Sequence, residues 1–456
     1  MNLEIIVLAA GQGTRMKSQL PKVLHTLAGR PLLQHVLQTA QGLQPHAVHV
    51  VVGHGAEEVK SALAAFPVNW VLQEEQLGTG HAVQQAMPGV DADSVVLVLY
   101  GDVPLITGPT LEALVALATE SPALLTARLE SPAGYGRILR DAAGALLGVV
   151  EHRDANAEQL LIDEINTGVL AAPARDLQRY LPQVGNANTQ GEYYLPDILP
   201  LAVEEGRNIG SCEADSELDI LGVNDRVQLN QVEREFQRRQ AERLLREGVS
   251  LADAGRIDVR GTLSCAADVS IDVNVVFEGD VILGRGVSIG PNCVIRNADI
   301  GDDSTIHGMS HIEEARVGVG ASVGPYARLR PGTRLADEAR VGNFVETKKA
   351  IIGPGSKVNH LSYVGDCEMG AGVNIGAGTI TCNYDGVNKH QTDIGDGVFV
   401  GSNSTLVAPL EIAARGFVAA GSTITEAVAS SDLALGRARQ RNISGWSRPV
   451  KDQEKD

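Results

Sequence analysis

The sequence has few cysteines, few aromatic residues and fewer cations than acids. Its 456 residues include five dispersed cysteines with no C-x-x-C pair, which argues against a disulfide framework or a zinc site and favours reduced thiols. The longest apolar runs, such as 95–99, fall far short of the roughly 20 residues that cross a bilayer. No leader-like pattern opens the chain. We therefore expect a cytoplasmic protein without a membrane span.

The deficit of positive charge also limits the possible partners. Lys and Arg number 38 and Asp and Glu 56, which gives a formal net charge of −18. A protein that binds the nucleic-acid backbone needs a basic face, so we expect no nucleic-acid partner, whereas small anions need only a few local cations. Aromatic residues make up 4% of the chain and glycine 50 residues. This composition predicts many tight turns around an aliphatic core.

Residues 1–225 alternate between apolar runs and segments with helical spacing. The runs at 5–8, 48–52 and 95–99 suit strands that are buried on both faces. Residues 32–40 and 56–64 between them have helical spacing of apolar positions. This order predicts a Rossmann-like α/β domain with a mostly parallel sheet. Charged residues crowd 226–248 with no Pro or Gly before Gly248, which predicts a linker helix.

From residue 249 onward an aliphatic residue followed by glycine recurs at a spacing of six or its multiples, with single-residue slips. A six-residue period is typical of a hexapeptide β-solenoid, in which three sides form a coil of about 18 residues. We therefore expect residues 249–456 to form a parallel β-helix. An ordinary β-sandwich would show period two instead. The pairs include Leu283–Gly284, Ile289–Gly290, Ile300–Gly301, Val323–Gly324, Val341–Gly342, Ile352–Gly353, Val364–Gly365, Ile375–Gly376, Ile394–Gly395 and Val400–Gly401.

Two segments near the C-terminus depart from this repeat. Residues 379–393 have no inward aliphatic residue at the period, so we expect a functional or interface loop. Residues 451–456 are charged, and we expect them to be disordered.

A glycine-rich turn follows the first apolar run. Residues 8–16 read LAAGQGTRM, and Pro21–Lys22 follow soon after. The glycines let backbone N–H groups face a phosphate, and Arg15 and Lys22 add positive charge. The G-x-x-x-x-G-K-[ST] pattern of a P-loop is absent, which argues against a kinase or ATPase. The full motif resembles that of the sugar-nucleotidyltransferases.

Two later segments fit the same chemistry. The amide of Gln73, in QEEQLGTGHA at 73–82, both donates and accepts, which suits a pyrimidine edge. This segment resembles the base-binding loop of uridylyltransferases, and an ordinary loop is the alternative. Asp102 follows an apolar run, at the end where parallel sheets place ligands. Its carboxylate suits Mg²⁺, and a capping role is the alternative.

A polar cluster interrupts the solenoid at NHLSY, residues 359–363. The spacing of Arg330, Glu346, Lys348, Tyr363 and Asn374 can place them on coils near His360. A lone histidine is more often structural. A neutral imidazole can nevertheless take a proton from an amine near neutral pH. Hexapeptide solenoids of this kind are typically CoA-dependent acyltransferases, so His360 is the candidate catalytic base.

From Leu8 to about Pro449, the order and spacing of these motifs resemble the bacterial bifunctional enzymes that are N-acetylglucosamine-1-phosphate uridylyltransferases and glucosamine-1-phosphate acetyltransferases. The resemblance implies a left-handed parallel β-helix that acetylates glucosamine 1-phosphate with acetyl-CoA. It implies an N-terminal domain that then transfers UMP from UTP, releasing pyrophosphate and forming UDP-N-acetylglucosamine. It also implies Mg²⁺ and a homotrimer.

The same resemblance implies roles for individual residues. For UTP and UDP-N-acetylglucosamine they are Leu8, Ala9, Ala10, Gly11, Arg15, Lys22, Gln73, Gly78, Thr79, Tyr100, Gly101, Asp102, Gly136, Glu151, Asn166 and Asn224. Asp102 and Asn224 would also hold the metal. The sugar phosphate of the acetylation reaction would contact Arg330, Lys348, Tyr363 and Asn374. Acetyl-CoA would contact Ala377, Asn383, Tyr384, Ser402, Ala420 and Arg437.

Two other functions remain possible at this stage. One is a nucleotidyltransferase whose solenoid only regulates or oligomerises, and the other is a scaffold with neither site active. The polar cluster around His360 and the inserted segment 379–393 argue against the first. The dense N-terminal motifs argue against the second.

Overall fold

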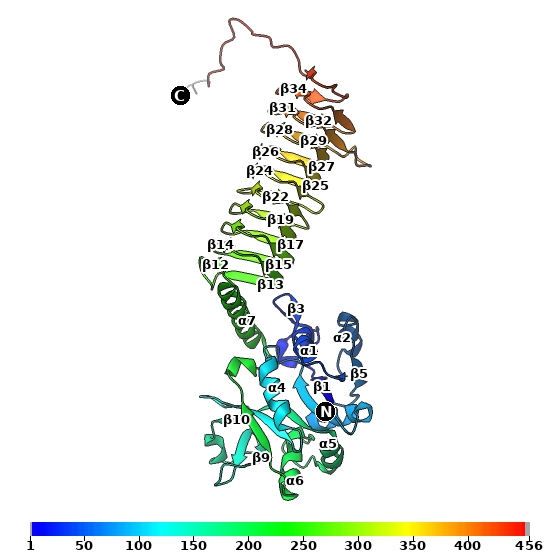
Figure 1. Cartoon of the computed structure of the whole chain (residues 1–456), viewed down its shortest axis with the longest axis vertical. Helices are drawn as coiled ribbons and strands as arrows, with labels where there is room; N and C mark the ends of the chain where they lie inside the picture. Colours follow the sequence, from blue (N-terminus) through cyan, green and yellow to red (C-terminus); the bar gives the residue numbers. More distant parts are fainter. Residues whose placement is uncertain (1, 452–456) are drawn as a thin grey trace, which may run out of the picture. The chain divides into compact units, whose positions relative to one another are not determined.

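The computed structural model describes residues 2–451, which divide into two compact units, one up to residue 240 and one from residue 241 onward (Figure 1). Most of the charged tail, for which we expected disorder, lies outside the described residues. Among residues 2–451, no helix is long and apolar enough to cross a membrane.

The first unit is built on a mixed sheet whose centre is parallel. The strand order is β11-β7-β10-β6-β1-β4-β5, and β1 pairs in parallel with both β4 and β6. Strand β10 runs antiparallel to β6 and β7. The predicted mostly parallel α/β domain is confirmed. The strands are β1 (Leu3–Ala9), β4 (Ala47–Val52), β5 (Asn69–Leu72), β6 (Val95–Tyr100), β7 (Ala123–Arg128), β8 (Arg137–Arg140), β9 (Leu146–Val150), β10 (Glu164–Pro173) and β11 (Gly210–Glu213), with a small hairpin of β2 (Thr26–Leu27) and β3 (Arg30–Pro31).

Apolar cores lie on both faces of this sheet. Alternate residues of β1 face opposite ways, so Ile5 joins one buried cluster and Ile6 the other. Both side chains are fully buried, which explains why the run is continuously apolar. The helices are α1 (Leu32–Gly42), α2 (Ala56–Ala62), α3 (Thr79–Ala86), α4 (Gly108–Leu117), α5 (Ala174–Tyr180), α6 (Ile198–Glu204) and α7 (Arg226–Arg246).

Helix α7 packs its first part against the N-terminal unit. Val232 is fully buried in a cluster with Leu27 and Val223, and Phe236 packs beside it. The Ala28 backbone N–H donates to Glu233 Oε2 at 2.7 Å. The residues up to 240 therefore contribute to the core of the first unit.

The second unit is a parallel β-helix made of stacked coils, which confirms the predicted solenoid (Figure 1). One ladder contains β12 (Ser250–Leu251), β14 (Ser270–Ile271), β16 (Ser288–Ile289), β18 (Thr305–Ile306), β21 (Ser322–Val323), β24 (Arg340–Asn343), β26 (Lys357–His360), β28 (Asn374–Ile375), β31 (Phe399–Val400), β34 (Phe417–Val418) and β36 (Leu433–Ala434). The other ladder contains β13 (Ile257–Cys265), β15 (Val275–Leu283), β17 (Val294–Ile300), β19 (His311–Glu313), β20 (Arg316–Val317), β22 (Arg328–Leu329), β23 (Arg334–Leu335), β25 (Glu346–Ile352), β27 (Tyr363–Met369), β29 (Ile380–Cys382), β30 (Thr392–Ile394), β32 (Thr405–Val407), β33 (Leu410–Ile412) and β35 (Thr423–Ile424).

Glycine at the corners of the β-helix has a steric cause. A Cβ on Gly342 would lie 2.0 Å from Asn359 O in the next coil. The aliphatic residue before each such glycine points inward, and Val341 is 1% exposed. In the segment 379–393 the inward positions are taken by Thr381 and Thr392 instead, both buried. The segment therefore differs from the repeat already within the strands β29 and β30, where threonine replaces the inward aliphatic residue.

We predict that an N-terminal fragment is more stable when it ends at residue 246 than at 225. The shorter fragment lacks Val232 and Phe236, and burial of one such side chain stabilises by about 1.5–3 kcal/mol. Its melting temperature, measured by circular dichroism, should be lower by at least about 3 °C. The longer fragment should transfer uridylyl groups to N-acetylglucosamine 1-phosphate. Equal melting temperatures of the two fragments would show that residues 226–246 do not stabilise the N-terminal unit.

Candidate active sites

A cavity of about 230 Å³ lies where the parallel strands β1, β5 and β6 end. Carboxyl ends of parallel strands are the usual ligand edge of such sheets. Segments that are distant in sequence therefore meet here. The predicted site residues that line the cavity are Leu8, Ala9, Ala10, Gly11, Lys22, Gln73, Gly78, Thr79, Tyr100 and Asp102.

Lys22, Asp102 and Asn224 form the charged wall of this site. The Lys22 ammonium forms an ion pair with the Asp102 carboxylate and donates to Asn224 Oδ1 at 3.2 Å. The two oxygens thus converge on one cationic group. Among residues 2–451, no three His, Cys, Asp or Glu side chains are grouped to hold a metal. A Mg²⁺ ion would fit Asp102 and Asn224, because it typically takes one or two protein oxygens plus phosphate oxygens and water.

Two glycines of the first turn have different roles. A Cβ on Gly11 would meet no protein atom within 4 Å. Its backbone therefore borders open space in the cavity, where a phosphate can approach. Gly13 has φ +63°, and a Cβ there would lie 2.6 Å from Lys22 Cβ. Gly13 thus allows the turn to pass close to Lys22.

The loop 73–80 is held by a segment that the sequence analysis missed. Gln73 is 3% exposed, and its Nε2 donates to Gly78 O at 3.2 Å. Tyr193 N donates to Leu77 O, and Gly80 N donates to Tyr193 O, both at 2.8 Å. Glu192 and Gln76 also line the cavity. No local motif marks Glu192, since it reaches the site only through pairing across more than 110 residues.

A second group of predicted residues lies beside Tyr100. A Cβ on Gly168 would lie 2.7 Å from the Tyr100 ring. Asn166 Oδ1 accepts from Gly168 N at 2.8 Å, and Asn166 N donates to Gly136 O at 2.9 Å. Glu151 is also close, because a Cβ on Gly136 would lie 3.0 Å from its Oε1. The structure therefore brings Gly136, Glu151 and Asn166 together, although they are not in the wall of the 230 Å³ cavity.

Burial, together with neighbouring carboxylates, raises the pKa of two groups in this region. Burial raises the pKa of Glu151, and the nearby Asp197, Asp154 and Glu192 add to the effect. Burial also raises the pKa of Tyr100, with further contributions from Glu151 and Asp102. A neutral, hydroxylated ligand is favoured beside these carboxylates over another anion.

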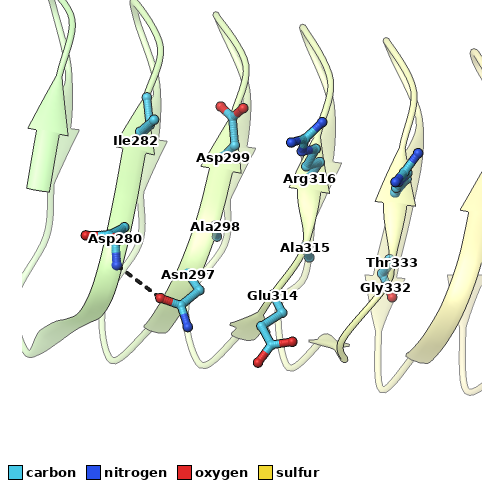
Figure 2. A pocket seen from close by; sticks show the side chains of 11 residues that line it. Asp280, Ile282, Asn297, Ala298, Asp299, Glu314, Ala315, Arg316, Gly332 and Thr333 are labelled. Atoms are coloured by element: carbon cyan, nitrogen blue, oxygen red, sulfur yellow. Dashed lines mark hydrogen bonds between the residues drawn. The ribbon is translucent and has the colours of Figure 1, made fainter. Parts of the chain in front are cut away.

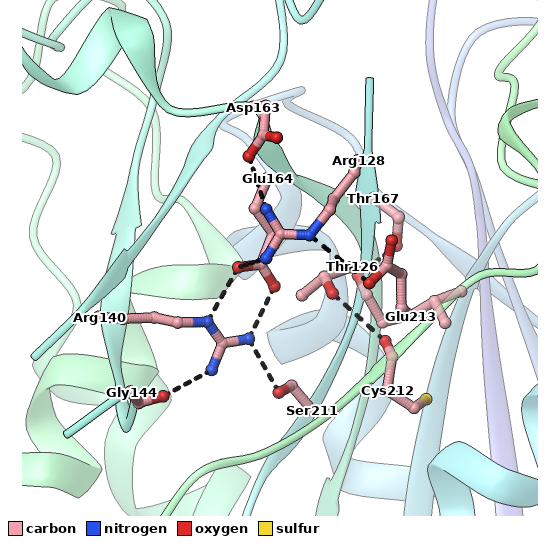
Figure 3. A network of polar contacts seen from close by, with 11 residues as sticks. Thr126, Arg128, Arg140, Gly144, Asp163, Glu164, Thr167, Ser211, Cys212 and Glu213 are labelled. Carbon is pink, nitrogen blue, oxygen red and sulfur yellow. Dashed lines mark hydrogen bonds and ion pairs between the residues drawn. The ribbon is translucent and has the colours of Figure 1, made fainter. Parts of the chain in front are cut away.

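An arginine–glutamate network anchors β10 just before Asn166 (Figure 3). Glu164 is 5% exposed and accepts from Arg140 Nε at 2.9 Å and Nη2 at 2.7 Å. Arg128 pairs with Asp163 at 2.7 Å. The hydrogen bonds from Arg140 lower the pKa of Glu164. Because bidentate arginine–carboxylate pairs fix geometry, this network limits movement of the strand that carries Asn166.

The remaining predicted residues of this unit differ in placement. Gly101 is buried next to Asp102, whereas Arg15 is exposed and outside the cavity wall. The contact of Arg15 with a phosphate stays a prediction.

A cavity of about 430 Å³ on the β-helix gathers another predicted set. It is lined by Arg330, Lys348, Tyr363, Asn383 and Tyr384, together with Lys389, which the sequence analysis missed. Arg330 pairs with Glu346 at 2.8 Å, and Lys348 Nζ lies 3.6 Å from Asp366 Oδ2. A hydrogen bond with Lys348 and its positive charge lower the pKa of Lys389. Three cations around one cavity favour a phosphate ligand.

His360 does not line this cavity but belongs to a column along one corner of the β-helix. Gly378 N donates to His360 O at 3.2 Å, Asn403 N to Ala377 O at 2.7 Å, and Gly421 N to Ser402 O at 2.8 Å. His360, Ala377, Ser402 and Ala420 therefore occupy equivalent positions in successive coils. At the next three positions of this column, Ala377, Ser402 and Ala420 have small side chains, which leave room for an extended ligand along the corner.

Two predicted residues lie elsewhere on the β-helix. Asn374 is on β28, in register with Lys357 of β26. Arg437 is exposed beyond β36. Within one chain, neither lines the cavity with Arg330 and Lys348.

Another face of the β-helix carries a groove of about 540 Å³ that contains none of the predicted residues (Figure 2). Its floor includes the buried Ala298 and Ala315, and its sides carry Asp299, Glu314 and Arg316. Because both signs of charge line it, the groove favours neither anions nor cations.

Together, the fold and the two sites define a class of protein: a nucleotidyltransferase domain joined to an acyltransferase β-helix of hexapeptide repeats. Residues 5–163 match the MobA-like NTP transferase domain, and residues 259–365 match the GMPPB C-terminal domain.

Curated relatives identify the family. The bifunctional protein GlmU of Marinobacter nauticus is 56% identical over 98% of this chain and 99% of the relative. Those of Idiomarina loihiensis and Pseudomonas putida are 55% and 54% identical, over 98% and 99% of this chain and 99% of each relative. This chain belongs to the family of the bifunctional protein GlmU. It is an enzyme with acetyltransferase and uridylyltransferase activities in the synthesis of UDP-N-acetylglucosamine.

We predict that Gly11→Ala impairs uridylyl transfer without destabilising the fold. The new methyl group meets no protein atom within 4 Å, but it occupies space beside the backbone where a phosphate would lie. The KM for UTP, from pyrophosphate release, should rise at least about tenfold, which corresponds to about 1.4 kcal/mol of lost binding. The melting temperature should stay within about 1 °C of that of the unchanged protein. An unchanged KM would mean that the phosphates bind elsewhere.

Proposed function

We propose that the N-terminal cavity aligns UTP with N-acetylglucosamine 1-phosphate for uridylyl transfer. One observation supports this proposal most directly: the Gly11 backbone borders the cavity at the same edge of the sheet at which Lys22 contacts Asp102 and Asn224. A phosphate oxygen of the sugar attacks the α-phosphorus of UTP, and the bond to pyrophosphate breaks. Lys22 offsets negative charge on the α-phosphate. The site around Asn166 and Glu151 suits the hydroxyl groups of the sugar.

Asp102 and Asn224 are the residues that would hold Mg²⁺. When bound, the ion supplies positive charge beside the α-phosphate. Lys22 contacts the same two side chains, so with the ion bound its ammonium would be available to the substrate phosphates.

Asp102→Asn should lower uridylyl transfer by at least about 100-fold, since even indirect partners of a metal contribute 10- to 100-fold. The amide keeps the shape but loses the charge that both Lys22 and Mg²⁺ contact. Pyrophosphate release and acetyl transfer should be assayed on the same preparation. Equal loss of both activities would indicate a folding role for Asp102 instead.

In the β-helix we propose that His360 is the base for acetylation of glucosamine 1-phosphate by acetyl-CoA. The imidazole takes a proton from the amine as the amine nitrogen forms a bond to the thioester carbonyl carbon. The C–S bond then breaks, and the imidazolium returns the proton to the leaving sulfur, so that CoA leaves as a thiol. The cavity with Arg330, Lys348 and Lys389 holds the sugar phosphate. The column of Ala377, Ser402 and Ala420 accommodates acetyl-CoA, with contacts from Asn383, Tyr384 and Arg437.

We propose that a homotrimer completes this acetylation site. In a single chain His360 and Asn374 do not line the cavity with the three cations, so a neighbouring copy would bring the two parts together. The exposed, stacked pairs Tyr326–Phe344 and Phe399–Phe417 support association through the β-helix.

The proposed substrates also fit a cytoplasmic location. All five cysteines are free thiols, as expected in a reducing compartment. Glucosamine 1-phosphate, acetyl-CoA and UTP are the small-molecule partners, and we expect no nucleic-acid partner from the net charge of −18.

His360→Ala should lower acetyl transfer by roughly 10²- to 10⁴-fold, the usual contribution of a general base. Uridylyl transfer should be unchanged, because its candidate residues all lie before residue 225. Free CoA thiol released from acetyl-CoA gives the acetylation rate. A variant with nearly unchanged acetylation would show that His360 is a structural residue.

A further inference from the structure

We propose that Asn343 is a positioning residue that fixes the tautomer and orientation of His360 for acetyl transfer. This inference rests on the proposed role of His360 as the base. Asn343 Oδ1 lies 3.0 Å from His360 Nδ1. With this oxygen accepting, the hydrogen of a neutral imidazole is on Nδ1, and Nε2 keeps the lone pair that a base needs.

The backbone of the β-helix holds the two residues in place. Asn343 ends β24 and His360 ends β26, and the two are in register. Leu361 N donates to Asn343 O at 3.1 Å, and Ser362 Oγ donates to His360 O at 2.8 Å. Gly342, whose missing Cβ lets the coils approach, directly precedes Asn343. The contact between the side chains therefore follows from coil stacking.

Asn343 lies on the side of His360 that faces away from the column of small residues. The coil after His360 carries Ala377 at the same corner, at the start of the column of small residues. Asn343 belongs to the coil before His360. It can orient the imidazole without entering the space that the column leaves for the acetyl donor.

The charged groups of the surrounding strands are the same in every variant of position 343. Arg340 and Lys357 precede Asn343 and His360 by three residues on β24 and β26. Glu346 and Tyr363 begin the adjoining β25 and β27. A change in pH dependence on substitution of Asn343 therefore reports the contact with the imidazole.

The first test compares Asn343→Ala, Asn343→Asp and a matched control in the full chain. Ser322→Ala is the control, because Ser322 Oγ lies 3.1 Å from His307 Nε2, a similar contact between coils away from the site. N343A should lower kcat of acetylation about 10- to 100-fold, less than the roughly 10²- to 10⁴-fold loss expected without the base itself, with both KM values within about twofold. S322A should change neither constant, and uridylyl transfer should be unchanged in all three variants.

The pH profile distinguishes positioning from a merely structural role. The carboxylate of N343D still accepts from Nδ1–H, so kcat at alkaline pH should recover to within a few-fold of the unchanged protein. Because a negative charge favours the imidazolium, the acid-side midpoint of the profile should move to higher pH. If N343D is as impaired as N343A and the midpoint does not move, the proposal is wrong.

A double variant separates this proposal from the role of His360 itself. Asn343→Ala should cause no further loss of acetylation in the His360→Ala background, because it acts through the imidazole. If H360A alone retains acetylation, the proposed base is wrong, and the role of Asn343 with it. If H360A is impaired but N343A behaves like the unchanged protein, only the role of Asn343 is refuted.

Discussion

The stacking of coils at the spacing of one hydrogen-bonded strand is the constraint on which the second half of the molecule depends. Neighbouring strands lie about 4.8 Å apart, so a side chain at a corner faces the equivalent position in the next coil. A Cβ at Gly342 or Gly376 would collide with the following coil, which leaves glycine as the residue that permits this approach. The same stacking places Asn343, His360 and Ala377 in one column. Packing and chemistry therefore have the same origin here, because the repeat that buries Val341 also sets the neighbours of His360.

In the first unit, the ends of parallel strands bring distant residues together, as coil stacking does in the β-helix. Parallel strands end at one edge of the sheet, so the residues that follow β1, β5 and β6 meet in one cavity. Lys22 shares its ammonium between Asp102 and Asn224, which are 122 residues apart in the chain. A phosphate or metal that enters has to compete with this arrangement. Because the ammonium already contacts both oxygens, the site stays electrically compensated without a ligand.

How much the sequence predicts depends on whether a residue acts through a local pattern or through a distant contact. The apolar runs predicted β1, β4 and β6, because a strand buried on both faces has to be apolar throughout. The aliphatic–glycine pairs predicted the β-helix, because in each pair the aliphatic side chain points into the core and the glycine allows neighbouring coils to approach at a corner. Glu192 and Asn343 carry no such signal, and the departure of residues 379–393 from the repeat predicted a functional loop without singling out Lys389. These three residues reach their sites through strand pairing or coil stacking, which depends on the number of residues in each coil and on the loop at 383–391.

The electrostatics connect the two sites to the acidic character of the whole chain. With a net charge of −18, the chain as a whole does not attract phosphorylated substrates, so attraction has to be local. In the β-helix cavity Arg330, Lys348 and Lys389 lie close enough that Lys348 lowers the pKa of Lys389. This mutual repulsion is a cost to the unliganded state. Under the proposed function, a phosphate that contacts all three cations relieves this repulsion. The neighbouring Glu346 and Asp366 limit that repulsion by pairing with Arg330 and Lys348.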